Sequence, residues 1–317
     1  MLGLYHANEN DASIMRKIID SMSNLVQSDD IFVLDIGFRD VVPLLQSKEF
    51  KVMMPSIKGK RKQLTAKEAN ESRSVTKIRW VVEAKHGALK QRFKLLDQTL
   101  DNKMLPNIKS LYRIASYLLN LFSKPLTSDI HMSNEIYEQM ISKNYSENIL
   151  AVEVEQKGWM RKKLPFQMFS SNDITDFPQL SEPELKLLFT GSYQLGQAIS
   201  YLAELLDENG AFKMAYVKDQ TKILKIQVQS RHISKKVYRC FIKYHPEAEG
   251  IHTIQQYCCE CANGLRTVGC CSHVAAVIYY LSHGRYLSKI QRPNERLSSL
   301  FQNEGLTVTI ETDSDDD

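Results

Sequence analysis

Five of the six cysteines lie between Cys258 and Cys271, and a histidine follows two residues later. Cys259 and Cys261 are two residues apart, and Cys271 and His273 repeat that spacing. On extended backbone, side chains two positions apart point the same way, so each pair can approach one point together. Three thiolates and one imidazole can complete a tetrahedral shell around Zn²⁺. A shell closed in this way has no open position for a substrate, so we expect a structural zinc.

Other interpretations of the cluster stay open at this point. Cys258 could act with Cys261, or Cys270 could replace Cys271, as metal ligands. The cysteines could also be core residues without a metal. A disulfide framework needs an oxidising compartment, and neighbouring cysteines are poor disulfide partners for each other. We prefer the first set of four because both of its pairs have the same spacing.

The segments around the cluster predict how its ligands are held. Runs rich in β-branched and aromatic residues precede it, which predicts a small antiparallel sheet. These runs are FKMAYV, ILKIQVQ, KKVYRCFIKY and HTIQQYCCEC. Gly264 and Gly269 let the chain turn back between the ligand pairs, and the apolar run Val274–Leu281 predicts a helix. In this order, residues 225–285 resemble a SWIM-type zinc finger, which implies a zinc-binding module for nucleic acid or protein, often found in transposase-related proteins.

Upstream, the sequence predicts a mixture of helices and strands. Apolar spacing predicts helices over residues 12–27, 65–100 and 107–122, and short apolar runs predict strands over 31–35 and 51–55. The apolar stripe expected along the long helix consists of Ile78, Val82, Leu89, Phe93 and Leu96.

Two runs in this half, FVLDIGFRD and NESRSVTKIRWVVEAKHGALKQRF, resemble the DDE endonuclease domain of Harbinger-type and related transposases. The resemblance covers about residues 1–122. In that family the second catalytic acid ends a strand before a D-x-G-[FY]-R turn, and the third lies on a helix in R-x-x-V-E-x-x-x-G-x-L-K. The resemblance therefore implies catalytic roles for Asp35 and Glu83, with Mg²⁺ or Mn²⁺ bound between them. Cleavage by two hard metal ions needs carboxylates that converge from separate elements, as a strand end and a helix can provide.

Each acid also has an ordinary explanation. Asp35 could be a turn residue at the end of a strand, and Glu83 could form a surface salt bridge with Arg79 or Lys90. Arg79, His86 and Lys90 share the helix face of Glu83, so a cationic surface could bring the acid to a phosphate backbone.

The first acid of the family's triad is expected on a strand upstream of LGLYHANENDASI, in a region that we expect this chain to lack. Asp11 follows that position in the family, so it is not assigned this role. Loss of the first strands would also leave sheet edges that need covering. We therefore expect the DDE-like half to be inactive in this chain.

Charge is distributed unevenly. The whole chain has a net charge of +4, whereas residues 51–94 carry thirteen lysines and arginines against three glutamates, a net charge of +10. This density suggests DNA as a partner, although a solvated helix face is the alternative. The expected nucleic-acid contacts are Arg73, Lys77, Arg79 and Lys90.

The sequence contains no apolar run of transmembrane length and no N-terminal signal pattern, so we expect a reducing compartment, the nucleus or alternatively the cytoplasm. The expected fold class is α/β, with a partial RNase H-like DDE domain followed by a small α+β SWIM zinc module. The expected segments are a truncated DDE domain over 1–125, an irregular linker over 126–180, a helical segment over 181–224, the zinc module over 225–285 and a tail with an acidic end over 286–317.

Three hypotheses for function follow. The first is a transposon-derived protein that binds zinc and DNA or protein and has no remaining nuclease activity. The second is an active metal-dependent transposase or endonuclease whose first acid is supplied upstream or by another chain. The third is a SWIM adaptor whose N-terminal half serves only as a scaffold for protein contacts.

Overall fold

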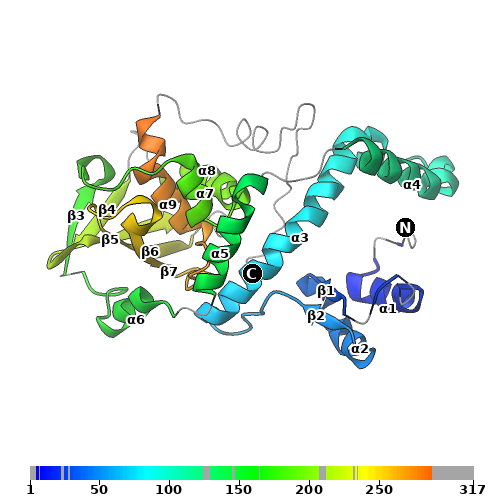
Figure 1. The fold of residues 1–317 in the computed structure, drawn as a ribbon, viewed down its shortest axis with the longest axis horizontal. Helices are drawn as coiled ribbons and strands as arrows, with labels where there is room; N and C mark the ends of the chain where they lie inside the picture. Colours follow the sequence, from blue (N-terminus) through cyan, green and yellow to red (C-terminus); the bar gives the residue numbers. More distant parts are fainter. Residues whose placement is uncertain are drawn as a thin grey trace. The chain divides into compact units, whose positions relative to one another are not determined.

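The computed structural model describes residues 5–6, 8–22, 25–27, 29–123, 129–144, 147–163, 165–206, 212–230, 233 and 235–287, without the side chains of 203 and 204. The described residues form two compact units (Figure 1). The first lies within 1–57 and 72–126, and the second within 58–71 and 127–300. The acidic end predicted for the chain lies outside the described residues, which stop at Leu287.

The first unit contains a short parallel sheet. β1 (Ile31–Val33) pairs with β2 (Lys51–Met53), and the 3-10 helix η1 (Ile36–Val41) and α2 (Val42–Ser47) make the crossover that parallel strands require. α1 (Asp11–Met22) is shorter than the predicted helix. The core of this part consists of Ala12, Met15, Ile19, Phe32, Leu34, Val41 and Leu45.

Two helices complete the first unit. α3 (Ala66–Arg92), which begins in the second unit, ends before the predicted residue 100, and α4 (Leu105–Phe122) packs on it through a small cluster. The cluster comprises Ala88, Leu89, Ala115 and Leu119. The predicted apolar stripe is wrong in its first part, because Ile78 and Val82 are 56% and 58% exposed. Small residues such as Ala84 and Ala88 form the buried face of α3 instead, and the spacing of large side chains cannot reveal such a face.

A five-stranded antiparallel sheet organises the second unit. It consists of β3 (Phe166–Ser170), β4 (Lys213–Val217), β5 (Gln220–Gln229), β6 (Val237–Tyr244) and β7 (Ile254–Cys259), in that spatial order. The prediction of an antiparallel sheet before the cysteines is therefore confirmed, and the sheet gains β3 at one edge.

The irregular linker predicted over residues 126–180 is wrong. That stretch contains α5 (Ser133–Lys143), α6 (Ile149–Gln156) and β3. These elements are short and contain polar residues, so the spacing of their apolar residues did not predict them. β3 pairs with β4 from Phe166 opposite Val217 to Ser170 opposite Lys213, so the sheet of the cysteine cluster extends well upstream of residue 225.

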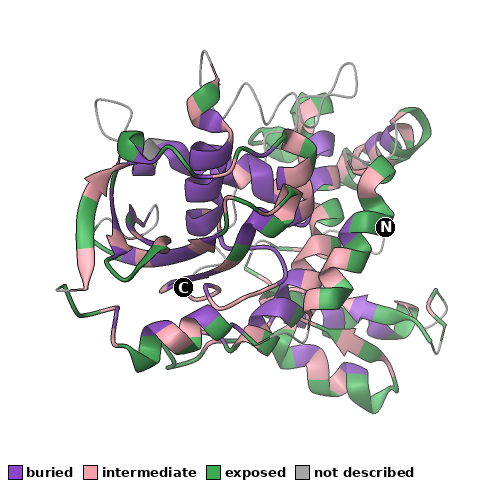
Figure 2. Ribbon diagram, turned by 60° about the vertical axis from the view of Figure 1, so that its left-hand side comes forward, coloured by how far each residue is buried: buried purple, intermediate pink, exposed green. Residues whose placement is uncertain are grey.

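One face of the sheet packs on helices and forms the main core (Figure 2). α9 (Ser272–Ser282) is buried from His273 to Ser282, as expected for a helix that is apolar around its circumference. α8 (Ser192–Leu205) lies beside it. The core thus surrounds the start of α9, where the second pair of proposed ligands lies.

The helical segment predicted to begin at Ser181 is two helices. Ser181 and Glu184 form a capping box at the start of α7 (Glu182–Leu188). The chain then breaks at Thr190 and Gly191, whose φ angles are 60° and 127°. Glycine tolerates such a backbone, so α8 can begin in a new direction.

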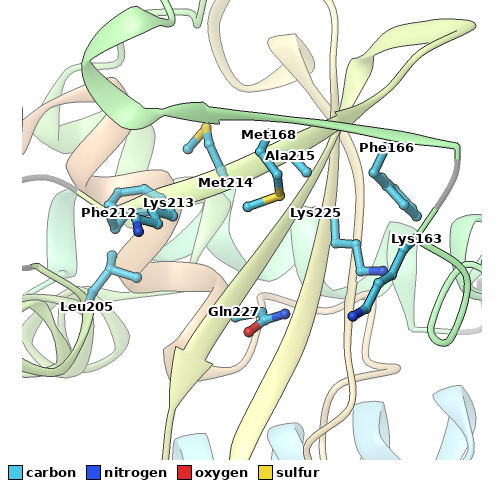
Figure 3. A pocket seen from close by; sticks show the side chains of 10 residues that line it. All are labelled: Lys163, Phe166, Met168, Leu205, Phe212, Lys213, Met214, Ala215, Lys225 and Gln227. Atoms are coloured by element: carbon cyan, nitrogen blue, oxygen red, sulfur yellow. The ribbon is translucent and has the colours of Figure 1, made fainter.

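The other face of the sheet is only partly covered. α6 and Trp159 pack over one part of it, against Ile223, Phe241 and Cys258. Another part holds a hollow of about 580 Å³ with lysines and apolar side chains in its lining (Figure 3). The lining residues are Lys163, Phe166, Met168, Leu205, Phe212, Lys213, Met214, Ala215, Lys225 and Gln227.

Candidate functional site

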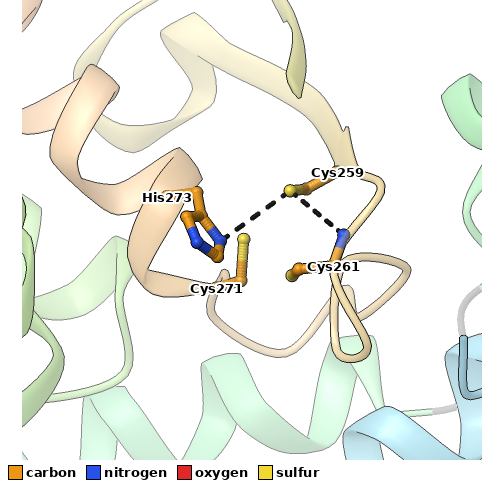
Figure 4. A group of neighbouring side chains, drawn as sticks. All are labelled: Cys259, Cys261, Cys271 and His273. Carbon is orange, nitrogen blue, oxygen red and sulfur yellow. Dashed lines mark hydrogen bonds between the residues drawn. The ribbon is translucent and has the colours of Figure 1, made fainter. Parts of the chain in front are cut away.

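The structure brings the four proposed zinc ligands together (Figure 4). Cys259 ends β7, Cys261 lies in the following turn, Cys271 is the N-cap residue of α9, and His273 lies in the first turn of that helix. Their ligand atoms all lie within 4.8 Å of one another, and all four residues are buried. The sulfur of Cys259 is 3.9 Å from Nδ1 of His273. A strand end and a helix start thus supply one ligand pair each.

Glycine is required in the turn that joins the pairs. The Cys259 N–H donates to the carbonyl oxygen of Gly264 at 3.0 Å, and the Gly264 N–H donates to that of Cys261 at 2.9 Å. A Cβ atom at position 264 would lie 2.0 Å from the carbonyl oxygen of Cys259, which no side chain can tolerate. Gly269 adopts a φ of 60° before the chain enters α9.

A side chain far upstream supports the same turn, and sequence reasoning missed it. The Nε2 atom of Gln63 donates to the carbonyl oxygens of Cys259 and Cys261, at 2.6 and 2.8 Å. The N–H of Leu64 donates to the carbonyl oxygen of Ala262 at 3.0 Å. Residues 58–71 therefore fix the backbone of the first ligand pair. No local pattern could reveal these contacts, since they are made to backbone atoms nearly 200 residues away.

The histidine ring has the environment of a metal ligand. Its centroid lies 4.9 Å from that of Tyr201 and 4.7 Å from that of Tyr238, so aromatic rings hold it in place. Among the described residues, its buried Nε2 atom has no hydrogen-bond partner. The other ring nitrogen, Nδ1, faces the Cys259 sulfur, so it is the nitrogen that would bind a cation, and Nε2 would then carry the ring proton. The chemistry of the four donors therefore fits zinc.

The pKa values of the thiols follow from their mutual contacts. Burial raises the pKa of Cys259, and hydrogen bonds with Cys259 and Cys271, followed by burial, raise that of Cys261. Burial also acts to raise the pKa of Cys271, but hydrogen bonds with the other three side chains outweigh it and the pKa falls. Withdrawal from water thus opposes charge on the first pair, and a bound cation would reverse that preference.

The remaining cysteines lie outside the group of four. Cys258 points to the other face of β7, in the cluster with Trp159, as alternation along a strand requires. Cys270 is buried in the main core. Cys240, which sequence reasoning did not consider as part of the site, lies in β6 with its sulfur 3.4 Å from that of Cys259. Strand pairing brings it there from 19 residues upstream.

The two proposed catalytic acids also meet in the structure. Nη2 of Arg79 lies 2.9 Å from Oδ2 of Asp35 and 2.9 Å from Oε1 of Glu83. Asp35 also caps η1, accepting a hydrogen bond from the N–H of Ile36. The structure thus contains both contacts that the ordinary explanations predicted: Asp35 caps a turn, and Glu83 forms a salt bridge with Arg79. At the same time, one guanidinium nitrogen holds both carboxylates together.

The carboxylate of Asp11 lies against the turn that follows Asp35. A Cβ atom at Gly37 would be 2.7 Å from Oδ2 of Asp11. Glycine at this position therefore leaves room for that carboxylate beside the chain.

The expected nucleic-acid contacts differ in exposure. Arg73 is only 3% exposed, and the side chain of Arg79 is 12% exposed and bound to two carboxylates. Lys77 is half-buried, and Lys90 is exposed. Of these four, Lys90 is therefore the residue best presented to a phosphate.

Comparison with known proteins bears on the part of the chain that contains the two acids. Residues 4–120 match the family model of the DDE superfamily endonucleases. The match includes Asp35, Arg79 and Glu83, supports a DDE transposase-like domain, and suggests the use of a divalent metal ion and binding to DNA. No curated protein and no solved structure matches the chain. The cysteine cluster lies outside the match, so its assignment rests on geometry and donor chemistry.

Of the helices within the described ranges, none combines the length and hydropathy that a transmembrane span needs.

Replacing Gln63 by Ala should lower the free energy of unfolding of the second unit by about 1–3 kcal/mol, because the Cys259 carbonyl loses its side-chain donor and the Cys261 carbonyl keeps only the Gly264 N–H. The measurement is a urea titration in a Trp80→Phe background, in which the fluorescence of Trp159 reports on the second unit. Lys62→Ala, a change at the exposed neighbour, is the control. Equal stability of the two variants would contradict a supporting role for Gln63.

Replacing Arg79 by Gln should increase the affinity for Mn²⁺ about tenfold, which corresponds to about 1.4 kcal/mol, because two carboxylates lose their shared cation. Electron paramagnetic resonance of free Mn²⁺ measures the affinity. Arg39→Gln removes the same charge from an exposed arginine that pairs with Asp40 at 3.1 Å. The interpretation fails if both variants bind Mn²⁺ equally, or if adding Asp35→Asn does not abolish the gain.

Proposed function

We propose that this chain is a transposon-derived DNA-binding protein whose second unit contains a structural zinc ion in a SWIM-type module. One observation carries the zinc-binding function, namely the buried convergence of three thiols and an imidazole. Bound zinc would cross-link the end of β7 to the start of α9 and stabilise the fold. The sheet before the first ligand pair and the apolar helix after the second support the SWIM assignment.

The DNA-binding part of the proposal rests on the match over residues 4–120 and on the basic charge of residues 51–94. In this proposal, the first unit is a partial RNase H-like fold that retains affinity for DNA without cleaving it. Arg79 supports the loss of cleavage, because its guanidinium occupies the space between Asp35 and Glu83 that divalent ions would need. A DNA-binding role implies a nuclear location, with the cytoplasm as the alternative.

An active metal-dependent endonuclease is the second candidate function. The observation in its favour is that Asp35 and Glu83, from a strand end and a helix, converge on one point. Metal ions could displace Arg79 there if a further acid completed the site. A nicking assay on supercoiled DNA with Mg²⁺ or Mn²⁺ distinguishes the two candidates. Activity that disappears in both Asp35→Asn and Glu83→Gln would replace the proposed function with this one.

The purified chain should contain about one zinc ion, measured by inductively coupled plasma mass spectrometry after purification without added metal. Cys259→Ala and His273→Ala should lose the ion, because four ligands are needed to close the shell. Cys258→Ala, in the same strand but on the other face, should keep it. A metal content near zero in the unmodified chain, or equal contents in all variants, would contradict the zinc site.

Affinity for duplex DNA should fall about tenfold between 50 and 200 mM salt, as expected for two or more phosphate contacts. Fluorescence anisotropy of a labelled duplex measures it. Lys90→Gln should make the slope of log affinity against log salt concentration shallower, by the amount expected for one lost phosphate contact. Lys157→Gln, which breaks an ion pair with Glu153 in the second unit, should leave that slope unchanged. Affinity that does not change with salt would favour a protein-binding adaptor over a DNA-binding protein.

A further inference from the structure

Cys240 faces the zinc ligand Cys259 across the sheet. β6 and β7 pair with Cys240 opposite Cys259. The Glu260 N–H donates to the carbonyl oxygen of Arg239, whereas the Cys259 N–H donates to Gly264 instead of Cys240. The two cysteines therefore form a non-hydrogen-bonded pair, the position at which facing side chains approach most closely.

The two sulfur atoms are in hydrogen-bond contact. The Cys240 S–H donates to the Cys259 sulfur at 3.4 Å, and both residues are fully buried. Cys240 is not one of the four residues whose ligand atoms lie within 4.8 Å of one another. Four ligands already complete the shell of a structural zinc, so this thiol has no coordination position to fill.

A second donor reaches the same sulfur. The N–H of Cys261 lies 3.4 Å from the Cys259 sulfur, and Figure 4 marks this contact. Cys259 thus receives one hydrogen bond from backbone and one from a neighbouring strand. A zinc-bound thiolate keeps lone pairs that can accept such bonds, and the bonds strengthen when the acceptor is charged.

We propose that Cys240 is a positioning residue for the zinc site, and that its S–H hydrogen bond orients the Cys259 thiolate and reduces its excess charge. The proposal rests on the zinc-binding function proposed above. Outer donors of this kind hold metal ligands in place and tune the charge that they present to the metal. Cys240 is fully buried, so its S–H group is screened from solvent.

Three variants separate the roles that Cys240 could have. Cys240→Val keeps an apolar side chain of similar shape and removes the donor. Cys240→Ser keeps a donor on a smaller side chain. Cys258→Val is the matched control, since it replaces a buried cysteine on the other face of the adjacent strand. All three are made in the full chain, and zinc affinity is measured by competition with a chromophoric chelator.

Cys240→Val should weaken zinc binding about 10- to 100-fold, the usual effect of losing an outer-shell partner. Cys240→Ser and Cys258→Val should stay close to the unmodified chain. In the Co²⁺-substituted protein, the sulfur-to-cobalt charge-transfer band should move to longer wavelength in Cys240→Val alone, because an unbonded thiolate gives up charge more easily. This spectroscopic shift separates a hydrogen bond from a purely packing role.

Other outcomes would overturn the proposal in distinct ways. Weak binding by Cys240→Ser with normal binding by Cys240→Val would show a packing role, and loss of metal in both would show a ligand. Unchanged affinity and spectrum in both would show no role. If Cys240→Val does not fold, Cys240→Ala provides the same comparison. Absence of zinc from the unmodified chain would instead overturn the proposed zinc function itself, and this inference with it.

Discussion

Three thiols and one imidazole are buried together where β7 ends and α9 begins, and an apolar core surrounds them. Polar groups withdrawn from water cost free energy unless they are paired, and here four such side chains are withdrawn together. The packing of the second unit depends on how the hydrogen-bonding and charge requirements of these four side chains are met. A cation shared by all four would meet them at once, and it would tie the sheet to the helix that fills the core.

In the first unit, two neighbouring carboxylates also need a positively charged partner. Asp35 and Glu83 lie close enough to share one nitrogen of Arg79, so a side chain supplies the positive charge. The same guanidinium offsets one of the two negative charges of this pair. Residues 4–120, which include the pair, match the family model of the DDE superfamily endonucleases. Because Arg79 is occupied in this way, and Arg73 is buried, the basic segment offers fewer phosphate contacts than its composition suggests.

Local patterns in the sequence predicted what is local in the structure. The spacing of the ligand pairs and the glycines between them depend on neighbours within a few residues. Cys240 and Gln63 could not be found in this way, because strand register and backbone contacts bring them to the site from far along the chain. β3 was missed since five residues at a sheet edge show little alternation. Ile78 and Val82 were misplaced because alanines form the buried face of their helix.

The central claim is that Cys259, Cys261, Cys271 and His273 hold one zinc ion. X-ray absorption at the zinc K-edge of the purified chain tests it most directly, because the fine structure reports the number and type of ligand atoms. We expect three sulfur atoms and one nitrogen, at about 2.3 and 2.0 Å, with no bound water. A first shell that contains oxygen, a different number of sulfur atoms, or a sample without zinc would contradict it.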